Sequence, residues 1–207
     1  MKLTLERIVD AGMATFAAHG YAGLSMRQVA ERLGVHAGSL YYHVRSKGAL
    51  LILLADRVAS EAYAAGTSAL DRLPPQASWQ QRIEAQLAAL RHTLSKHAGG
   101  PFLLATSPAT LSRGALSLME RLLSTLSEAN VAPEHRPVAA DTLLSYVTGF
   151  VLQEQSESTS PQLTADGVAE LTRHFPLTMR HGPQYEPDEM FSRSLRLQCA
   201  AIATLIQ

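Results

Sequence analysis

The chain lacks an excess of charge of either sign, and it has little cysteine. Its 207 residues contain 18 Lys and Arg against 18 Asp and Glu, so the formal net charge is zero. Because a basic domain is the usual electrostatic footprint of a nucleic-acid-binding protein, the neutral total argues at first against that class. The single cysteine, Cys199, excludes an intrachain disulfide and fits a reducing compartment.

Long hydrophobic runs are also missing. No uncharged apolar run reaches 18 residues, so we expect no membrane-spanning helix. The first seven residues lack the apolar stretch of a signal peptide, which predicts a soluble, cytoplasmic protein. Hydrophobic residues still make up 46% of the chain, too many for a disordered protein, and 13 Gly and 10 Pro are too few for a collagen-like or low-complexity one.

The motifs of common enzyme classes are absent. None of the eight histidines pairs with another at the i, i+4 spacing of a helical metal site. There is no Gly-rich phosphate loop and no Gly-x-Ser-x-Gly nucleophile elbow. Cys199 lies on an apolar stripe, where an inert buried thiol is expected. We therefore expect no catalytic residue, no metal and no cofactor, and an enzyme is the least favoured alternative.

Apolar residues recur with the spacing of helices along the whole chain. Leu5, Ile8, Val9 and Phe16, for example, fall on one helical face. Alternating Val, Ile and Thr strands and internal repeats are not found. The sequence predicts an all-α fold of about nine or ten helices, with the clearest at residues 5–19, 26–33, 36–44, 47–70, 79–96, 109–130, 137–154, 165–174 and 188–206. A break at 99–101 is followed by a short apolar piece at 102–106, and residues 155–164 are expected to form a loop.

The first three predicted helices carry the signals of a helix-turn-helix. Ser25 and Gln28 form a capping-box pattern that begins the second helix. Gly34 ends that helix, and Val35 completes a turn short enough to bring the third helix against the second. In this arrangement one helix braces across the DNA backbone and the next enters the major groove.

The stretch from Leu24 to Leu51 (LSMRQVAERLGVHAGSLYYHVRSKGALL) resembles the tetracycline-repressor (TetR) family. The segment 40–44, followed by Ser46 and Lys47, is among the most specific marks of the resemblance. The resemblance to the family is strong over residues 3–54, and a weaker similarity to the subgroup of the tetracycline repressors continues to the C-terminus. The resemblance implies a DNA-binding domain at residues 1–48 and a ligand-binding and dimerisation domain at residues 49–207.

The resemblance to the family implies how the domain docks on DNA, and the chemistry of the side chains suggests what each of them contacts. Arg27 can offer two donors to a guanine edge, while small residues at 37–39 permit close approach to bases. Lys47, in the first turn of the next helix, is expected on phosphate. Tyr41 or Tyr42 alone would more often be partly buried packing, and only the combination favours DNA. The predicted DNA-binding residues are Ser25, Arg27, His36, Ala37, Gly38, Ser39, Tyr41, Tyr42, His43 and Lys47.

For the second domain the resemblance implies a small-molecule pocket. The family's metal-binding histidine falls at Leu103 and its glutamate at Gln153, and neither residue here suits a hard cation. A metal-chelated tetracycline is therefore disfavoured, and an apolar or amphipathic effector is expected instead. For the apolar candidates, core packing is equally compatible. Gln86 and Gln153 are favoured as ligand contacts, because a polar residue beside apolar stripes needs a hydrogen-bond partner. The predicted ligand-binding residues are Tyr63, Gln86, Leu90, Phe102, Leu103, Thr106, Met119, Tyr146, Phe150 and Gln153.

The apolar helices at 137–154 and 188–206 predict a homodimer, because exposed apolar patches of that size mark interfaces. The charge also divides between the domains. Residues 1–48 hold six basic and three acidic side chains, a net +3, so the remainder carries −3. We expect a dimeric repressor of a palindromic double-stranded DNA operator, released by a small effector. An activator, an effector-independent regulator and a non-DNA interaction module stay as alternatives.

Overall fold

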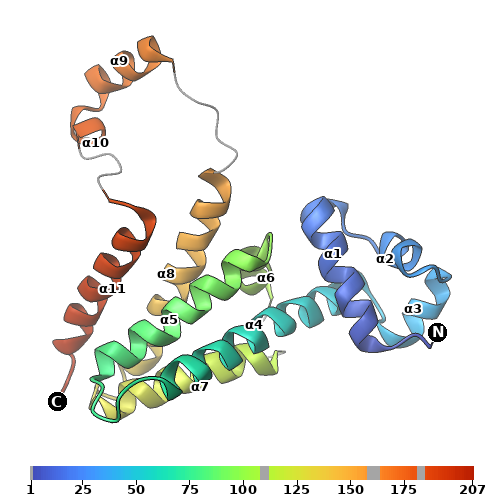
Figure 1. Cartoon of the computed structure of the whole chain (residues 1–207), viewed down its shortest axis with the longest axis horizontal. Helices are drawn as coiled ribbons and strands as arrows, with labels where there is room; N and C mark the ends of the chain where they lie inside the picture. Colours follow the sequence, from blue (N-terminus) through green and yellow to red (C-terminus); the bar gives the residue numbers. More distant parts are fainter. Residues whose placement is uncertain (1, 108–111, 158–163, 181–184) are drawn as a thin grey trace.

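The computed structural model describes residues 2–107, 112–157, 164–180 and 185–207, and these residues form eleven helices (Figure 1). In those ranges no strand occurs, and the single β-type contact is an isolated antiparallel bridge between Val131 and Ile206. The prediction of an all-α protein is confirmed. None of the described helices is long and apolar enough to cross a lipid bilayer.

The N-terminal domain consists of α1 (Leu5–Gly23), α2 (Met26–Leu33) and α3 (Ala37–His43). The longest helix, α4 (Lys47–Asp71), begins against this domain and runs into the second one (Figure 1). The second domain contains α4 together with α5 (Trp79–Lys96), α6 (Gly100–Thr106), α7 (Arg113–Glu128), α8 (Arg136–Glu157), α9 (Ala165–His174), α10 (Pro176–Arg180) and α11 (Pro187–Ala203).

Local capping explains where several of these helices begin. The Ser46 hydroxyl accepts from the Ala49 amide at 3.0 Å and starts α4. Ser78 forms a complete capping box with Gln81 at the start of α5. Each such cap satisfies an N–H that has no partner inside the helix, so a single hydroxyl fixes the first residue of the helix.

The structure corrects the predicted elements at four places. Helix α10 was not expected, so the described chain has eleven helices instead of nine or ten. Helix α1 continues for one turn beyond Gly20, whose φ of 64° interrupts it. Helix α6 starts at Gly100 after Gly99 in the left-handed region, so Gly100-Pro101 belongs to the helix. Helix α8 includes residues 155–157, which were expected to begin a loop, while residues 108–111 and 158–163 lie outside the described residues.

One continuous apolar core runs through both domains. Its N-terminal part surrounds Leu40 of α3, and its C-terminal part surrounds Leu90 of α5; both side chains are fully buried. Leu50, Leu54 and Val58, along one face of α4, connect the two parts. The apolar core is therefore continuous along α4 from one domain to the other.

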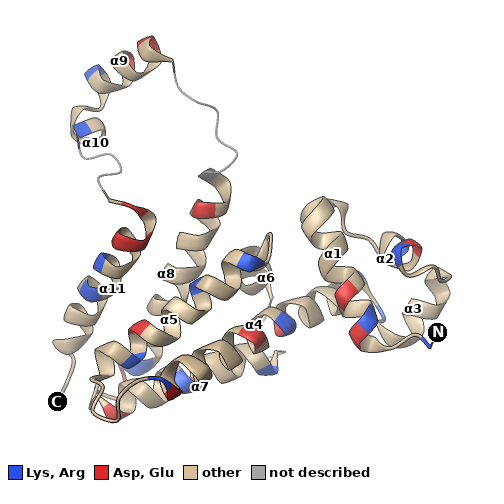
Figure 2. Cartoon of the chain, viewed as in Figure 1, with Lys and Arg blue, Asp and Glu red and all other residues tan. Residues whose placement is uncertain are grey.

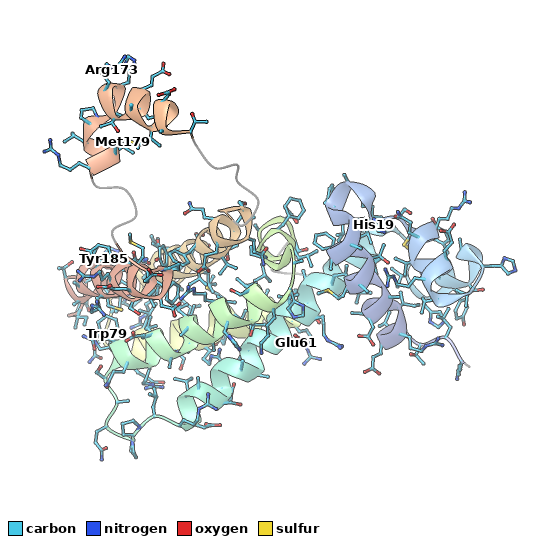
Figure 3. All side chains as sticks on the ribbon, turned by 45° about the horizontal axis from the view of Figure 1, so that its top comes forward. His19, Glu61, Trp79, Arg173, Met179 and Tyr185 are labelled. Atoms are coloured by element: carbon cyan, nitrogen blue, oxygen red, sulfur yellow. The ribbon has the colours of Figure 1, made fainter. Side chains whose placement is uncertain are left out.

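An ion-pair chain crosses the junction of the two domains on the surface of α4. Asp10 of α1 pairs with Arg57 at 3.1 Å, and Arg57 also pairs with Glu61 at 2.8 Å. The carboxylate of Glu61, labelled on α4 in Figure 3, accepts a hydrogen bond from Nε2 of His97, the residue after α5, at 2.7 Å. Burial alone would raise the pKa of Glu61, but the hydrogen bonds with His97 and Arg57 outweigh it and lower the pKa.

Candidate DNA-binding surface and ligand cavity

The turn between α2 and α3 has the geometry that the sequence predicted. Gly34 adopts φ 67° and ψ 34°, in the left-handed region, and its amide donates to carbonyls of α2. The Val35 amide donates to the Ala30 carbonyl at 3.1 Å, which completes a Schellman-type C-cap. The Ser25 hydroxyl accepts from the Gln28 amide at 3.2 Å, although the Gln28 side chain contacts that hydroxyl and not the Ser25 backbone.

Helix α3 is anchored by Leu40 and by its C-cap residue Val44, and most of its other residues are exposed. Leu40 and Val44 are buried against the domain core. Tyr42 is 88% exposed, so it is not the partly buried packing residue that it would more often be on its own, whereas Tyr41, at 49% exposed, is still partly buried. His36, Gly38, Ser39 and His43 are exposed as well, and Ala37 is half-buried. The predicted contact residues of α3 therefore form one continuous outward surface, the recognition surface.

The recognition surface carries no formal charge. Helix α3 contains no Lys, Arg, Asp or Glu and is drawn wholly in tan in Figure 2. Charged donors come from the neighbouring helices instead. Arg27 of α2 is 84% exposed and pairs with Glu31 at 2.9 Å, one turn along the same helix. Such an exposed pair is worth less than about 1 kcal/mol, so phosphate or a guanine edge can displace Glu31.

Lys47 is held in place by a residue that sequence reasoning missed. Its ammonium donates to the Tyr21 carbonyl at 2.7 Å and lies 4.4 Å from the centroid of the Tyr21 ring. An ammonium has three donors, so two stay available for phosphate. Tyr21 comes from the last turn of α1, 26 residues away, and no local spacing in the sequence connects the two positions.

The second domain contains an apolar cavity of about 510 Å³ between α5, α6, α7 and α8. Leu90 and Met119, two of the predicted ligand-binding residues, line it. The other walls include Leu104 of α6, Leu116 of α7 and Leu144 of α8. Its volume falls within the roughly 300–1,000 Å³ typical of small-molecule sites.

The two glutamines favoured as polar contacts lie elsewhere. Gln86 is 2% exposed, and its amide nitrogen donates to the Arg82 carbonyl and to the Thr125 hydroxyl, each at 3.0 Å. Its carbonyl accepts from Arg121 at 3.1 Å, so the protein itself satisfies this side chain. Gln153 is exposed on α8 and does not line the cavity. The structure thus removes the expectation that Gln153 is a buried polar group in need of a partner.

The remaining predicted pocket residues lie at four other places in the structure. Phe102 and Thr106 line a different cavity of about 390 Å³, which lies between α1, α4 and α6 and also contacts Tyr21. Leu103 is fully buried in the core, and Tyr63 packs under the Arg121 guanidinium at 4.4 Å.

Tyr146 and Phe150 form an aromatic cluster with Phe191 of α11, with ring centroids 5.3 to 5.8 Å apart. The Arg91 guanidinium lies over Phe150 and Phe191 and pairs with Glu154 at 2.5 Å. These contacts join α5, α8 and α11, so this group has a packing role in the structure.

Polar groups of the cavity were also missed by sequence reasoning. Asp141, Ser145 and Thr148 of α8 line it, at intervals of three and four residues that place them on one helical face. The spacing of these three polar residues can be read from the sequence, but the two apolar stripes of the same helix indicated only burial. Within the described residues, no group of three or more His, Cys, Asp or Glu is arranged to hold a metal ion.

Comparison with known proteins adds to this geometry. Residues 8–54 match the family model of bacterial regulatory proteins of the tetR family, and residues 73–204 match that of the tetracyclin repressor-like C-terminal domain. An HTH-type transcriptional regulator of Saccharopolyspora erythraea is 34% identical over 73% of the chain, and the repressor DrrR1 of Streptomyces coeruleorubidus is 30% identical over 83%. The matched regions span 61% of the length of either relative.

Solved structures agree with the sequence matches. Mycobacterium smegmatis BioQ has a TM-score of 0.73 and 26% identity, with 98% of this chain and 99% of BioQ covered. A structure of BioQ with its double-stranded DNA operator is also similar, with a TM-score of 0.70. Since the two family models together cover both domains, and the second alone covers more than half of the chain, the protein belongs to the TetR family of transcriptional regulators.

Proposed function

We propose that the protein is a ligand-responsive transcriptional repressor, a cytoplasmic homodimer that binds a palindromic DNA operator and leaves it when a small apolar or amphipathic effector binds. The observation that carries this proposal is one uninterrupted helix, α4, which joins the helix-turn-helix to the domain that holds the apolar cavity. No Gly or Pro occurs between Ala49 and Ala65, so this part of α4 has no residue that favours a bend.

The recognition surface supports the DNA-binding step. Its exposed hydroxyl, imidazole and glycine groups suit contacts with base edges, and Arg27 and Lys47 flank it with charged donors. The similar BioQ structure contains an operator, and the relative DrrR1 is named a repressor. Phosphate contacts would fix the position of the domain, and the uncharged surface of α3 would read the sequence.

Unpartnered apolar surface supports a dimer through α8 and α11. Val138 of α8 is 66% exposed and Leu197 of α11 is 73% exposed. Helices α9 and α10 contain no buried residue, and Figure 3 shows Arg173 and Met179 of this pair away from the rest of the chain. Short isolated helices are marginal in water, so a second copy that packs against these surfaces would stabilise them.

A chain of aromatic contacts supports coupling between the cavity and the DNA-binding domain. Leu104 and Ala105 of α6 line the cavity. Phe102 of the same helix packs against Tyr21 with ring centroids 5.2 Å apart, and Tyr21 holds Lys47. An effector that binds better when α6 is displaced would therefore favour a different position of Lys47. Such an effector shifts the equilibrium only by its difference in affinity for the two states.

A reporter gene placed behind the DNA upstream of the protein's own gene tests the repressor role. We expect higher reporter expression when the protein is absent and no response to the protein when the palindrome is scrambled. Lower expression without the protein would instead identify an activator. Unchanged expression, together with no salt-dependent binding to duplex DNA, would reject both in favour of a non-DNA interaction module.

The dimer is tested by light scattering of Leu197→Glu. A carboxylate at the centre of the proposed interface would be desolvated without a partner, so this variant should be monomeric. Leu5→Glu, at a 44% exposed position of α1, is the control and should stay dimeric. If both variants have the mass of the wild-type protein, α11 does not form the interface.

A further inference from the structure

We propose that the cavity between α5, α6, α7 and α8 selects a cationic amphiphile, an apolar molecule with one amine, through Asp141. This inference rests on the proposed function, because it names the chemical class of effector that the same cavity would take. Asp141 is the one ionisable side chain among the described residues that line the cavity. The other lining side chains are apolar or carry a hydroxyl, apart from one glycine.

The Asp141 carboxylate is exposed and has no counterion in the described part of the chain. All the ion pairs among the described residues involve carboxylates other than that of Asp141. The guanidinium of Arg136, on the same helix, donates to the Val131 carbonyl at 2.7 Å instead. An unpaired carboxylate beside apolar walls attracts a cation and repels an anion, so the cavity should bind cationic ligands in preference to anionic ones.

The hydroxyl groups beside Asp141 fit the same ligand. The Thr148 hydroxyl donates its proton to the Leu144 carbonyl at 2.8 Å, so its oxygen is left as an acceptor towards the cavity. Ser145 lies one helical turn after Asp141 and can accept as well. An ammonium group has three donors and no acceptor, and it therefore matches a wall of acceptors. The apolar body of the ligand would occupy the side lined by Leu90, Leu104 and Met119.

Gly149 gives a way to block the cavity without disturbing its walls. It lies on the cavity side of α8, and a Cβ built there meets no atom within 4 Å. Its backbone is in a helix, so a leucine is conformationally favourable at this position. Gly149→Leu should fill part of the cavity while the helix stays intact.

A matched trio of probes tests the proposal on the full-length protein: 4-phenylbutylamine, 4-phenylbutanol and 4-phenylbutyrate, with affinities measured by calorimetry. We expect the amine to bind about three- to fivefold more tightly than the alcohol, which is the upper part of the range of an exposed ion pair, and the carboxylate to bind most weakly. Asp141→Asn should remove the preference, so that the amine and the alcohol bind with similar affinity. Gly149→Leu should weaken all three, and circular dichroism verifies that both variants are folded.

The outcomes separate this inference from the proposed function. If the alcohol binds and Gly149→Leu blocks it, but the amine has no advantage, the cavity is a ligand site without charge selection and the inference is wrong. A preference for the amine that survives in Asp141→Asn also overturns it, because another group then supplies the charge. If none of the probes binds at millimolar concentration, the cavity does not select this class and the inference fails, while operator binding is measured independently.

Discussion

The ammonium of Lys47 lies 4.4 Å from the centroid of the Tyr21 ring and donates to the Tyr21 carbonyl at 2.7 Å. The contact joins the start of α4 to the end of α1, and the ring centroid of Phe102 of α6 lies 5.2 Å from that of Tyr21. Lys47, which is expected to contact phosphate, therefore contacts Tyr21, and Tyr21 in turn packs against α6. DNA affinity and the position of α6 should be linked through Tyr21.

Lys47→Ala should weaken binding to every DNA sequence by a similar factor. Each phosphate contact contributes about 0.9 to the slope of log K against log salt, so two copies in a dimer should lower the slope by about 1.8. Fluorescence anisotropy at several salt concentrations measures this. Lys96→Ala, at an exposed position at the end of α5, is the matched control and should leave the slope unchanged. An unchanged slope in Lys47→Ala would remove this residue from the phosphate contacts.

Tyr21→Ala should weaken DNA binding only when Lys47 is present. Removal of the ring takes away a cation–π contact worth about 0.5–1 kcal/mol at an exposed site, and Lys47 then loses its fixed position. A double-mutant cycle with Lys47→Ala should give a coupling energy of about that size. Tyr21→Phe keeps the ring and should behave like the wild-type protein. Additive effects in the cycle would show that the two residues act independently.

Gly34→Ala and Gly38→Ala form a matched pair, since an added Cβ meets no atom within 4 Å at either position. Gly34 has a φ of 67°, so alanine there should cost about 1–2 kcal/mol of backbone strain. Gly38 is in α3 with an ordinary φ, so alanine there should stabilise the free protein by about 0.5–1 kcal/mol. Thermal unfolding followed by circular dichroism should give Tm shifts of opposite sign. A shift of the same sign in both would contradict the left-handed role of Gly34.

Gly38→Ala should nevertheless bind the operator more weakly. Its new methyl group lies on the recognition surface, where it would hinder the approach to the base edges, and a disturbed base contact typically costs about 1–3 kcal/mol. We expect an affinity loss of about tenfold by anisotropy, in a variant that is more stable than the wild type. Full affinity in Gly38→Ala would place this residue away from the DNA.

Cys199 should react slowly with alkylating reagents in the folded protein. Burial, with the nearby Glu84 carboxylate as a smaller cause, raises the pKa of the Cys199 thiol to about 11. At pH 8 almost no thiolate is present, and thiolate is the reactive form. Mass spectrometry after iodoacetamide treatment should find modification mainly in denaturant. Rapid modification under native conditions would mean that α11 opens and exposes the thiol.

Much of the fold was predictable because its signals are local. Ser25, Ser46 and Ser78 mark the starts of three helices through hydroxyl caps, and Gly34 marks the turn through its left-handed backbone. Helix α10 could not be found in the same way, because five residues are too few for a helical period to show.

The site was predictable only where one segment of sequence contains it. The members of the recognition surface all come from the short helix α3, so the motif alone could name them, and their contact with DNA stays a prediction. Tyr21 and Lys47 meet across 26 residues, and the cavity is assembled from four helices. Gln86 illustrates the limit: its polarity indicated a partner, and the partners are Thr125, Arg82 and Arg121 of the protein itself.

Binding of the full-length protein to the palindrome upstream of its gene tests the central claim most directly. Anisotropy would compare this palindrome with a shuffled duplex of the same composition at physiological salt, and native mass spectrometry of the complex would count the chains. The account predicts two chains per palindrome and at least about a thousandfold tighter binding than to the shuffled duplex. Equal affinity for the two duplexes, or one chain per palindrome, would contradict it.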